Sequence, residues 1–192
     1  GNKNLQANVT ISGNLNIEGG NLRSLGFDIL LAGNFNNTGG TFQEGTDKIT
    51  FNGTGIQTIS APVEELFYDF EVNKSAGEVQ LNKDINVQNI LTLNGRNMVT
   101  SSYKVSLGTG SAPGTLVRNS GYIHGYFERY LNATATNYLF PIGNSSTYLP
   151  AIVRFSNITA GDLLLHFNDA VPGDNGLPIA DSPDTVRHAF TE

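Results

Sequence analysis

The chain has 192 residues, of which 39% are hydrophobic and 15% charged, and its net charge is −6. This composition favours a folded chain over a disordered one. The negative charge argues against nucleic-acid binding, which needs a dense basic surface, and against a polybasic membrane contact. The absence of cysteine excludes disulfides, thiol nucleophiles and zinc-thiolate sites. No segment approaches the roughly 18 consecutive apolar residues of a membrane span, so we expect no membrane insertion.

Glycine and asparagine are unusually frequent, with 22 and 23 copies. Both residues tolerate positive φ and form tight turns, so the chain must have many corners. The composition changes near residue 125, because 18 of the glycines and 17 of the asparagines lie at or before it. Six of the seven prolines, in contrast, lie from Pro113 onward. We therefore predict two regions, residues 1–125 and residues 126–192.

The first region begins with short runs in which apolar and polar residues alternate. Val9, Ile11, Leu15 and Ile17 start the series, and similar runs follow near residues 27–31, 49–51, 79–81, 85–87, 91–93 and 105–107. Period-two alternation predicts strands with one buried face, and Gly/Asn turns separate them.

Residues 60–70 break this alternation. Val63, Leu66, Phe67 and Phe70 would share one face of a helix, with Ser60 as its N-cap. This pattern predicts either a single helical turn at a corner or a short helix, which in both cases packs against the core.

The spacing of the strands bears on the architecture. Ile11, Leu31 and Phe51 follow one another at intervals of about 20 residues, which is a repeat length typical of solenoids. Later strands, at Val72, Leu93 and Leu107, follow at less regular intervals of roughly 14 to roughly 21 residues. The coils of a solenoid stack in parallel around an apolar core. An antiparallel sandwich, which also has short strands and frequent turns, is the alternative.

The second region has longer alternating runs at residues 126–131, 151–155 and 162–167. Pro141 and Pro150 indicate loops or strand edges, because proline cannot donate to a strand ladder. We predict that residues 126–192 start a β-sandwich-like region, which caps or follows the solenoid.

Several blocks of the sequence resemble a known family. Residues 49–59 match the line F-x-G-x-x-x-Q-x-I of very large secreted surface proteins of Bacteroidetes, and residues 121–129 match G-x-I-x-G-x-x-x-R. Phe140-Pro141-Ile142-Gly143 and Tyr148-Leu149-Pro150 follow in the family's order, so the resemblance covers roughly residues 40–170. The family's C-terminal sorting domain is not recognisable here, so we expect an internal segment.

This resemblance implies an all-β chain, in which a right-handed parallel β-helix is followed by a β-sandwich. It also implies an extracellular, cell-surface, adhesin-like protein without enzyme activity. The expected partners are surface glycans or other cell-surface proteins.

Carboxylates are the residues that a sugar-cleaving β-helix would need. Such polysaccharide lyases use clustered aspartates with calcium and a basic residue that abstracts a proton. The candidates in the first region are Asp28, Asp47, Asp69 and Asp84, with Lys48, Lys83 and Arg96 as bases. Asp28 and Asp47 could stack on adjacent coils, but nothing in the spacing gathers the others. We therefore expect no catalytic residue.

We also expect no cofactor and no metal site. The three histidines, His124, His166 and His188, lack the short spacing of a metal pair. Residues 169–176 resemble a calcium loop in composition, but they lack its order of ligands.

Exposed aromatic residues are the best candidates for ligand binding. Tyr122, Tyr126 and Tyr130 cluster where the two regions meet. Tyrosine rings can stack on sugars, but we favour the alternative, in which these rings pack the junction between the two regions. The sequence thus predicts a non-catalytic structural or adhesive segment of a bacterial cell-surface protein. A carbohydrate-binding or polysaccharide-lyase-like β-helix is the alternative.

Overall fold

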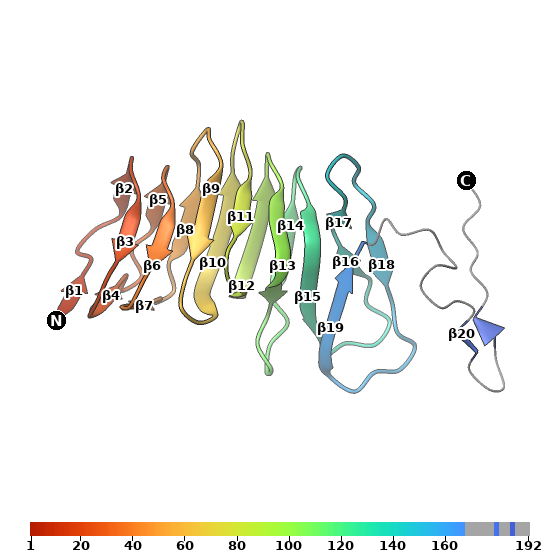
Figure 1. Ribbon diagram of the computed structural model, residues 1–192. Helices are drawn as coiled ribbons and strands as arrows, with labels where there is room; N and C mark the ends of the chain where they lie inside the picture. Colours follow the sequence, from red (N-terminus) through yellow and green to blue (C-terminus); the bar gives the residue numbers. More distant parts are fainter. Residues whose placement is uncertain (168–178, 181–184, 187–192) are drawn as a thin grey trace.

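The computed structural model describes residues 1–167, 179–180 and 185–186, and within these residues every regular element is a β-strand. Parallel strands stack into a β-solenoid of about seven turns. The coils follow one another in sequence order, from the N-terminus to β15 (Figure 1). The predicted parallel solenoid is therefore confirmed for the first region, and the antiparallel alternative is wrong there.

The strands form three ladders, which we call A, B and C. Ladder A contains β2 (Val9–Ile11), β5 (Ile29–Leu31), β8 (Lys48–Phe51), the second half of β10 (Glu65–Asn73), the second half of β12 (Ile85–Asn94) and β14 (Thr115–Arg118). Ladder B contains β3 (Leu15–Ile17), β6 (Phe35–Asn37), β9 (Gln57–Ser60), β11 (Val79–Leu81), the start of β13 (Met98–Leu107), the start of β15 (Ile123–Leu131) and β17 (Ile142–Gly143).

Ladder C has two parts. β1 (Asn2–Asn4), β4 (Asn21–Arg23) and β7 (Thr41–Gln43) form a separate three-stranded sheet. The first halves of β10 and β12 and the second halves of β13 and β15 form the other part. Long strands such as β10 therefore turn a corner and belong to two ladders.

The register confirms the regular spacing predicted for the first coils. Ile11 pairs with Leu31 and Leu31 with Phe51, and Phe51 continues to Val72 and Leu93. Leu107 does not continue this series, because it lies on ladder C opposite Val87 and Arg129. The sequence could not separate the ladders, since a strand that turns a corner shows one continuous alternation.

Inward side chains fill the axis of the solenoid with one continuous apolar core. Aromatic rings contact one another within and between coils: Phe35 contacts Phe67 with ring centroids 5.4 Å apart, Phe67 contacts Phe70 of the same strand at 5.2 Å, and Phe70 stacks on Phe51 at 5.1 Å. Such contacts add to the stabilisation from apolar burial.

The helix predicted within residues 60–70 is wrong. β10 begins at Glu65, and its backbone pairs with β12 and, from Asp69, also with β8. Phe67 and Phe70 both point inward because the strand turns from ladder C to ladder A between them. The corner replaces the usual two-residue spacing by three, which imitates a helical period. Val63 and Leu66 are 66% and 37% exposed, so they do not join the core.

The pairing changes along β15, which contains the predicted division between residues 125 and 126. One side of β15 pairs in parallel with β13, and the other pairs antiparallel with β19 (Gly161–His166). β16 (Tyr138–Phe140) and β18 (Ala151–Val153) form a further antiparallel pair, as do β20 (Ile179–Ala180) and β21 (Thr185–Val186). On ladder C, parallel stacking thus ends where antiparallel pairing begins, whereas ladder B continues in parallel to β17.

We predict that Phe70→Ala lowers the free energy of unfolding by about 3–5 kcal/mol, because it removes a fully buried ring that contacts two others. Leu66→Ala, on the outward side of the same strand, is the matched control and should cost less than about 1 kcal/mol. Urea unfolding measures both. Equal losses in the two variants would contradict the assignment of the core.

Candidate functional site

Side chains at the corners bond each coil to the next. Asn8 Oδ1 accepts the backbone N–H of Asp28 at 2.9 Å, and Asp28 Oδ1 accepts that of Lys48 at the same distance. A second corner repeats this arrangement, with Asn14 accepting from Asn34 and Asn34 from Thr58. We call such a contact a corner bracket. Brackets satisfy backbone donors at the corners, and this is one use of the many asparagines.

All four candidate aspartates are engaged in contacts with backbone N–H groups. The pairs are Asp28 Oδ1 with Lys48 N–H (2.9 Å), Asp69 Oδ1 with Ile90 N–H (2.9 Å), Asp84 Oδ1 with Lys104 N–H (3.0 Å) and Asp47 Oδ1 with Gly45 N–H (2.7 Å). Asp47 also accepts the hydroxyl of Ser24. These carboxylates serve the backbone at separate corners and do not converge on a substrate.

Two of the three candidate bases, Lys48 and Arg96, are also engaged, whereas Lys83 is half-buried. Lys48 Nζ lies 2.8 Å from a carboxylate oxygen of Glu71, and Arg96 Nε donates to the carbonyl oxygen of Ser75 at 3.0 Å. The hydrogen bond with Glu71 raises the pKa of Lys48. A general base at neutral pH needs the opposite shift.

The residues of the first family-like motif build a buried bracket. Gln57 Nε2 donates to the carbonyl oxygen of Leu31 at 2.9 Å, and its Oε1 accepts the N–H of Gly53 at 2.8 Å and Lys74 Nζ at 2.7 Å. Position 53 needs glycine, because a Cβ there would collide with the carbonyl of Ala32. Burial lowers the pKa of Lys74 to about 8. The motif thus joins three coils through their interior.

The second family-like motif closes the last coil. Gly125 has a φ of +126°, and a Cβ there would collide with Thr100 Oγ1. Arg129 is buried, and its Nη1 donates to the carbonyl oxygen of Leu139 at 2.8 Å. Its Nε has no hydrogen-bond partner among the described residues. Sequence analysis singled out this arginine only as part of the motif, since a strand position does not reveal a distant carbonyl partner.

The structure separates the three candidate tyrosines. Tyr122 is only 9% exposed and packs on Tyr148, with ring centroids 5.6 Å apart. The guanidinium of Arg118 lies 3.7 Å from the centre of the Tyr148 ring. This stack holds the loop before β18 against the last coils. Tyr126 and Tyr130, in contrast, lie half-buried on the outward side of β15.

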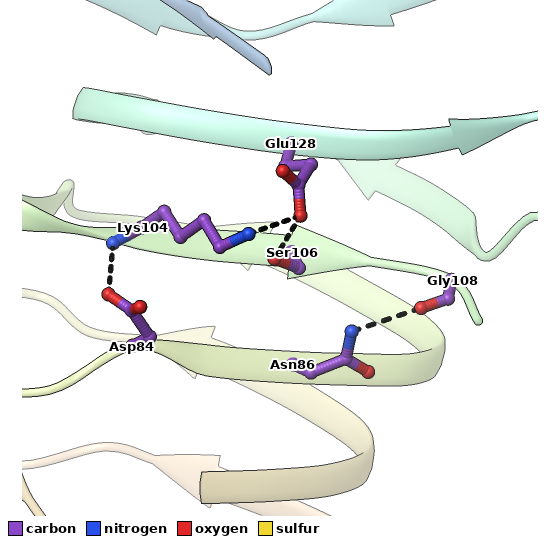
Figure 2. A network of polar contacts seen from close by, with 6 residues as sticks. All are labelled: Asp84, Asn86, Lys104, Ser106, Gly108 and Glu128. Carbon is purple, nitrogen blue, oxygen red and sulfur yellow. Dashed lines mark hydrogen bonds and ion pairs between the residues drawn. The ribbon is translucent and has the colours of Figure 1, made fainter. Parts of the chain in front are cut away.

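We call the group of Lys104, Tyr126, Glu128, Tyr130 and His166 the β15 surface. Lys104 Nζ lies 2.6 Å from Glu128 Oε1, and the Ser106 hydroxyl donates to the same oxygen at 2.9 Å, as Figure 2 shows. The ring of Tyr126 contacts that of His166, with centroids 4.5 Å apart. Two tyrosines thus flank an ion pair on one outward face.

The remaining candidates lie apart from this surface or cannot be placed. His124 lies on ladder B between Val99 and Gly143. His188 and residues 169–176 lie outside the described residues. In the part of the chain that the structure describes, no three histidine or acidic side chains gather closely enough to hold a metal ion.

Two neighbouring acids, Glu44 and Glu65, lie between the two parts of ladder C, where the protein partly shields them from water. Glu65 is buried and accepts from Asn37 Nδ2 at 2.9 Å, and Glu44 accepts from Gln88 Nε2 at 3.1 Å. Burial raises the pKa of both carboxyls, and the negative charge of Glu44 raises that of Glu65 further.

Comparisons with known proteins give no relative. No family model, curated protein or solved structure matches the chain. The described residues include no helix of the length and apolarity needed to cross a membrane.

We predict that Asp84→Ala lowers the free energy of unfolding by about 1 kcal/mol, because it leaves the Lys104 N–H without its acceptor. Asp84→Asn keeps the oxygen and should stay within about 0.5 kcal/mol of the parent chain. Urea unfolding distinguishes them. An equal loss in both variants would show that the negative charge matters more than the bracket.

We predict that Glu65→Gln flattens the dependence of stability on pH. The pKa of Glu65 is raised in the folded state, so the unfolded chain loses its proton first as the pH rises above about 4.5. Stability should therefore fall as the pH rises from the unfolded-state pKa to the folded-state pKa, and the glutamine variant should lack this contribution. Thermal melts from pH 4 to pH 8 measure it, with exposed Glu64→Gln as the control. Identical profiles for parent and Glu65→Gln would contradict the prediction.

Proposed function

We propose that this chain is a non-catalytic structural and adhesive segment of a large bacterial cell-surface protein. The observation that supports this most is that the four aspartates bond to backbone N–H groups at the corners. Groups that a polysaccharide lyase would devote to calcium or catalysis here help to hold the coil stack together. The order of the family-like blocks supports the cell-surface location. The partners of such a segment would be surface glycans or other cell-surface proteins.

The mechanism of such a segment is mechanical. About seven coils at a strand spacing of about 4.8 Å form a stack on the order of 30 Å long. Brackets and an uninterrupted core resist bending between coils, so the stack would hold a binding element at a fixed distance from its base.

Two finer features of the architecture belong to the same proposal. The coil is right-handed, because crossovers between parallel strands have this hand in about 98% of cases. The second region, of which residues 126–167 are described continuously, begins a β-sandwich-like cap, which protects the end of the solenoid from pairing with other chains. The antiparallel pairing of β15 with β19 supports the cap.

Stiffness can be tested with spin labels, since the chain has no cysteine of its own. Thr10 and Val117 are both exposed and lie five strands apart on ladder A. Labels on Thr10→Cys and Val117→Cys should give a narrow distribution of distances. Five strand spacings place the two backbone positions about 24 Å apart, and the length of the label side chains shifts the measured distance from this value. Double electron–electron resonance measures this distribution. A broad distribution would contradict a rigid spacer.

The absence of catalysis is tested separately. The purified chain is incubated with uronate-containing polysaccharides, with and without added calcium, and unsaturated products are followed by their ultraviolet absorbance. We expect no release. Product formation that is lost in Asp84→Asn would establish a lyase instead.

A further inference from the structure

We propose that the β15 surface binds an uncharged oligosaccharide. This inference rests on the adhesive part of the proposed function and gives its partner a chemical class. Four features of the surface support it: the placement of the tyrosines, the free positions on the ion pair, the charges around them and the order of these groups before binding.

Tyr126, Glu128 and Tyr130 occupy alternate positions of β15, so their side chains leave the same side of the strand. The separation of the two tyrosines corresponds to about 13 Å along a strand. Lys104 lies beside Tyr126 on β13, and His166 lies beside it on β19. The surface is therefore three strands wide and long enough for more than one sugar ring.

The ion pair leaves hydrogen-bonding positions open. Lys104 and Ser106 both bond to Glu128 Oε1, and no described residue bonds to Oε2. The side chains of Lys104 and Glu128 are 31% and 19% exposed. A free carboxylate oxygen beside an ammonium offers one acceptor and further donors at close range. Adjacent hydroxyls of a sugar can use both, because a hydroxyl both donates and accepts.

The charges argue against an ionic ligand. Lys104 and Glu128 neutralise each other, so the centre of the surface has no net charge to attract an ion. Asp162 lies opposite Tyr130 in β19, and the charges of Glu64 and Asp84 act on Lys104. Together these carboxylates would repel uronate or phosphate groups. An uncharged glycan meets no such penalty.

The surface is also held in place before any ligand arrives. The ring of Tyr126 rests against His166, and Tyr130 lies next to Gly108, at the base of the loop of residues 108–114. Two backbone hydrogen bonds between Thr109 and Ala112, of 2.8 and 3.1 Å, close this loop. Groups that are already ordered lose little freedom on binding, which favours affinity.

The test titrates the whole chain with neutral gluco-, manno-, galacto- and xylo-pentasaccharides and with matched oligouronates, followed by calorimetry and NMR. We expect saturable binding of at least one neutral sugar. Tyr126→Ala and Tyr130→Ala should each weaken it up to about tenfold, and Tyr126→Phe should stay within about threefold. Tyr68→Ala, a half-exposed tyrosine on β10, is the control and should bind like the parent chain. Circular dichroism confirms folding of each variant.

Three results would overturn the inference: no neutral sugar binds the folded chain, oligouronates bind more tightly, or both alanine variants bind like the parent. None of these would affect the spin-label distances or the lyase assay, so the spacer can survive the loss of its ligand. A broad distance distribution together with sugar binding would remove the spacer and leave a recognition module.

Discussion

The whole structure depends on one constraint: each coil must align its backbone with the next coil on two or three ladders at once. Parallel strands satisfy their backbone groups only through neighbouring strands, so a coil of unusual length must absorb its extra residues at a corner. The first coils of ladder A place Ile29 opposite Ile49, whereas the last and longest step places Leu91 opposite Leu116. That longest step contains the loop of residues 108–114, which leaves the apolar positions on both sides aligned. Corners take up the variation in length, and the core does not.

This constraint explains why polar residues at corners are used so consistently. A backbone N–H that falls between two ladders needs an acceptor, and a short side chain on the preceding coil provides one. Asn8, Asp28 and Asp84 all do this, although the first is neutral and the others are charged. Gln57 joins coils from inside the solenoid in another way, because it donates to the carbonyl oxygen of Leu31 on the preceding coil and accepts the N–H of Gly53 on its own coil. The fixed positions of both family-like motifs therefore describe how coils are joined and how the stack is closed.

Sequence reasoning recovered the features that repeat and missed those that depend on a corner. The regular spacing of Ile11, Leu31 and Phe51 predicted the register of ladder A, because every coil repeats the same inward position. Phe67 and Phe70 imitated a helix, since a corner changes the spacing of inward residues without any glycine or proline to mark it. Tyr122 grouped with Tyr126 and Tyr130 in the sequence. The chain turns between them, however, so Tyr122 packs on Tyr148 whereas the other two face outward.

The same logic locates the place where a solenoid can recognise a ligand. Stacked coils put similar side chains side by side, as in the pairs Asn16–Asn36 and Asn73–Asn94. The side chains of such a pair hydrogen-bond to each other, so those groups are already partnered within the stack. Recognition needs different groups next to one another, with some positions left free. On ladder C the parallel stacking ends at β15, and β19 brings His166 beside Tyr126 from a distant part of the sequence. The end of the repeat therefore creates the chemical variety that the repeat itself cannot provide.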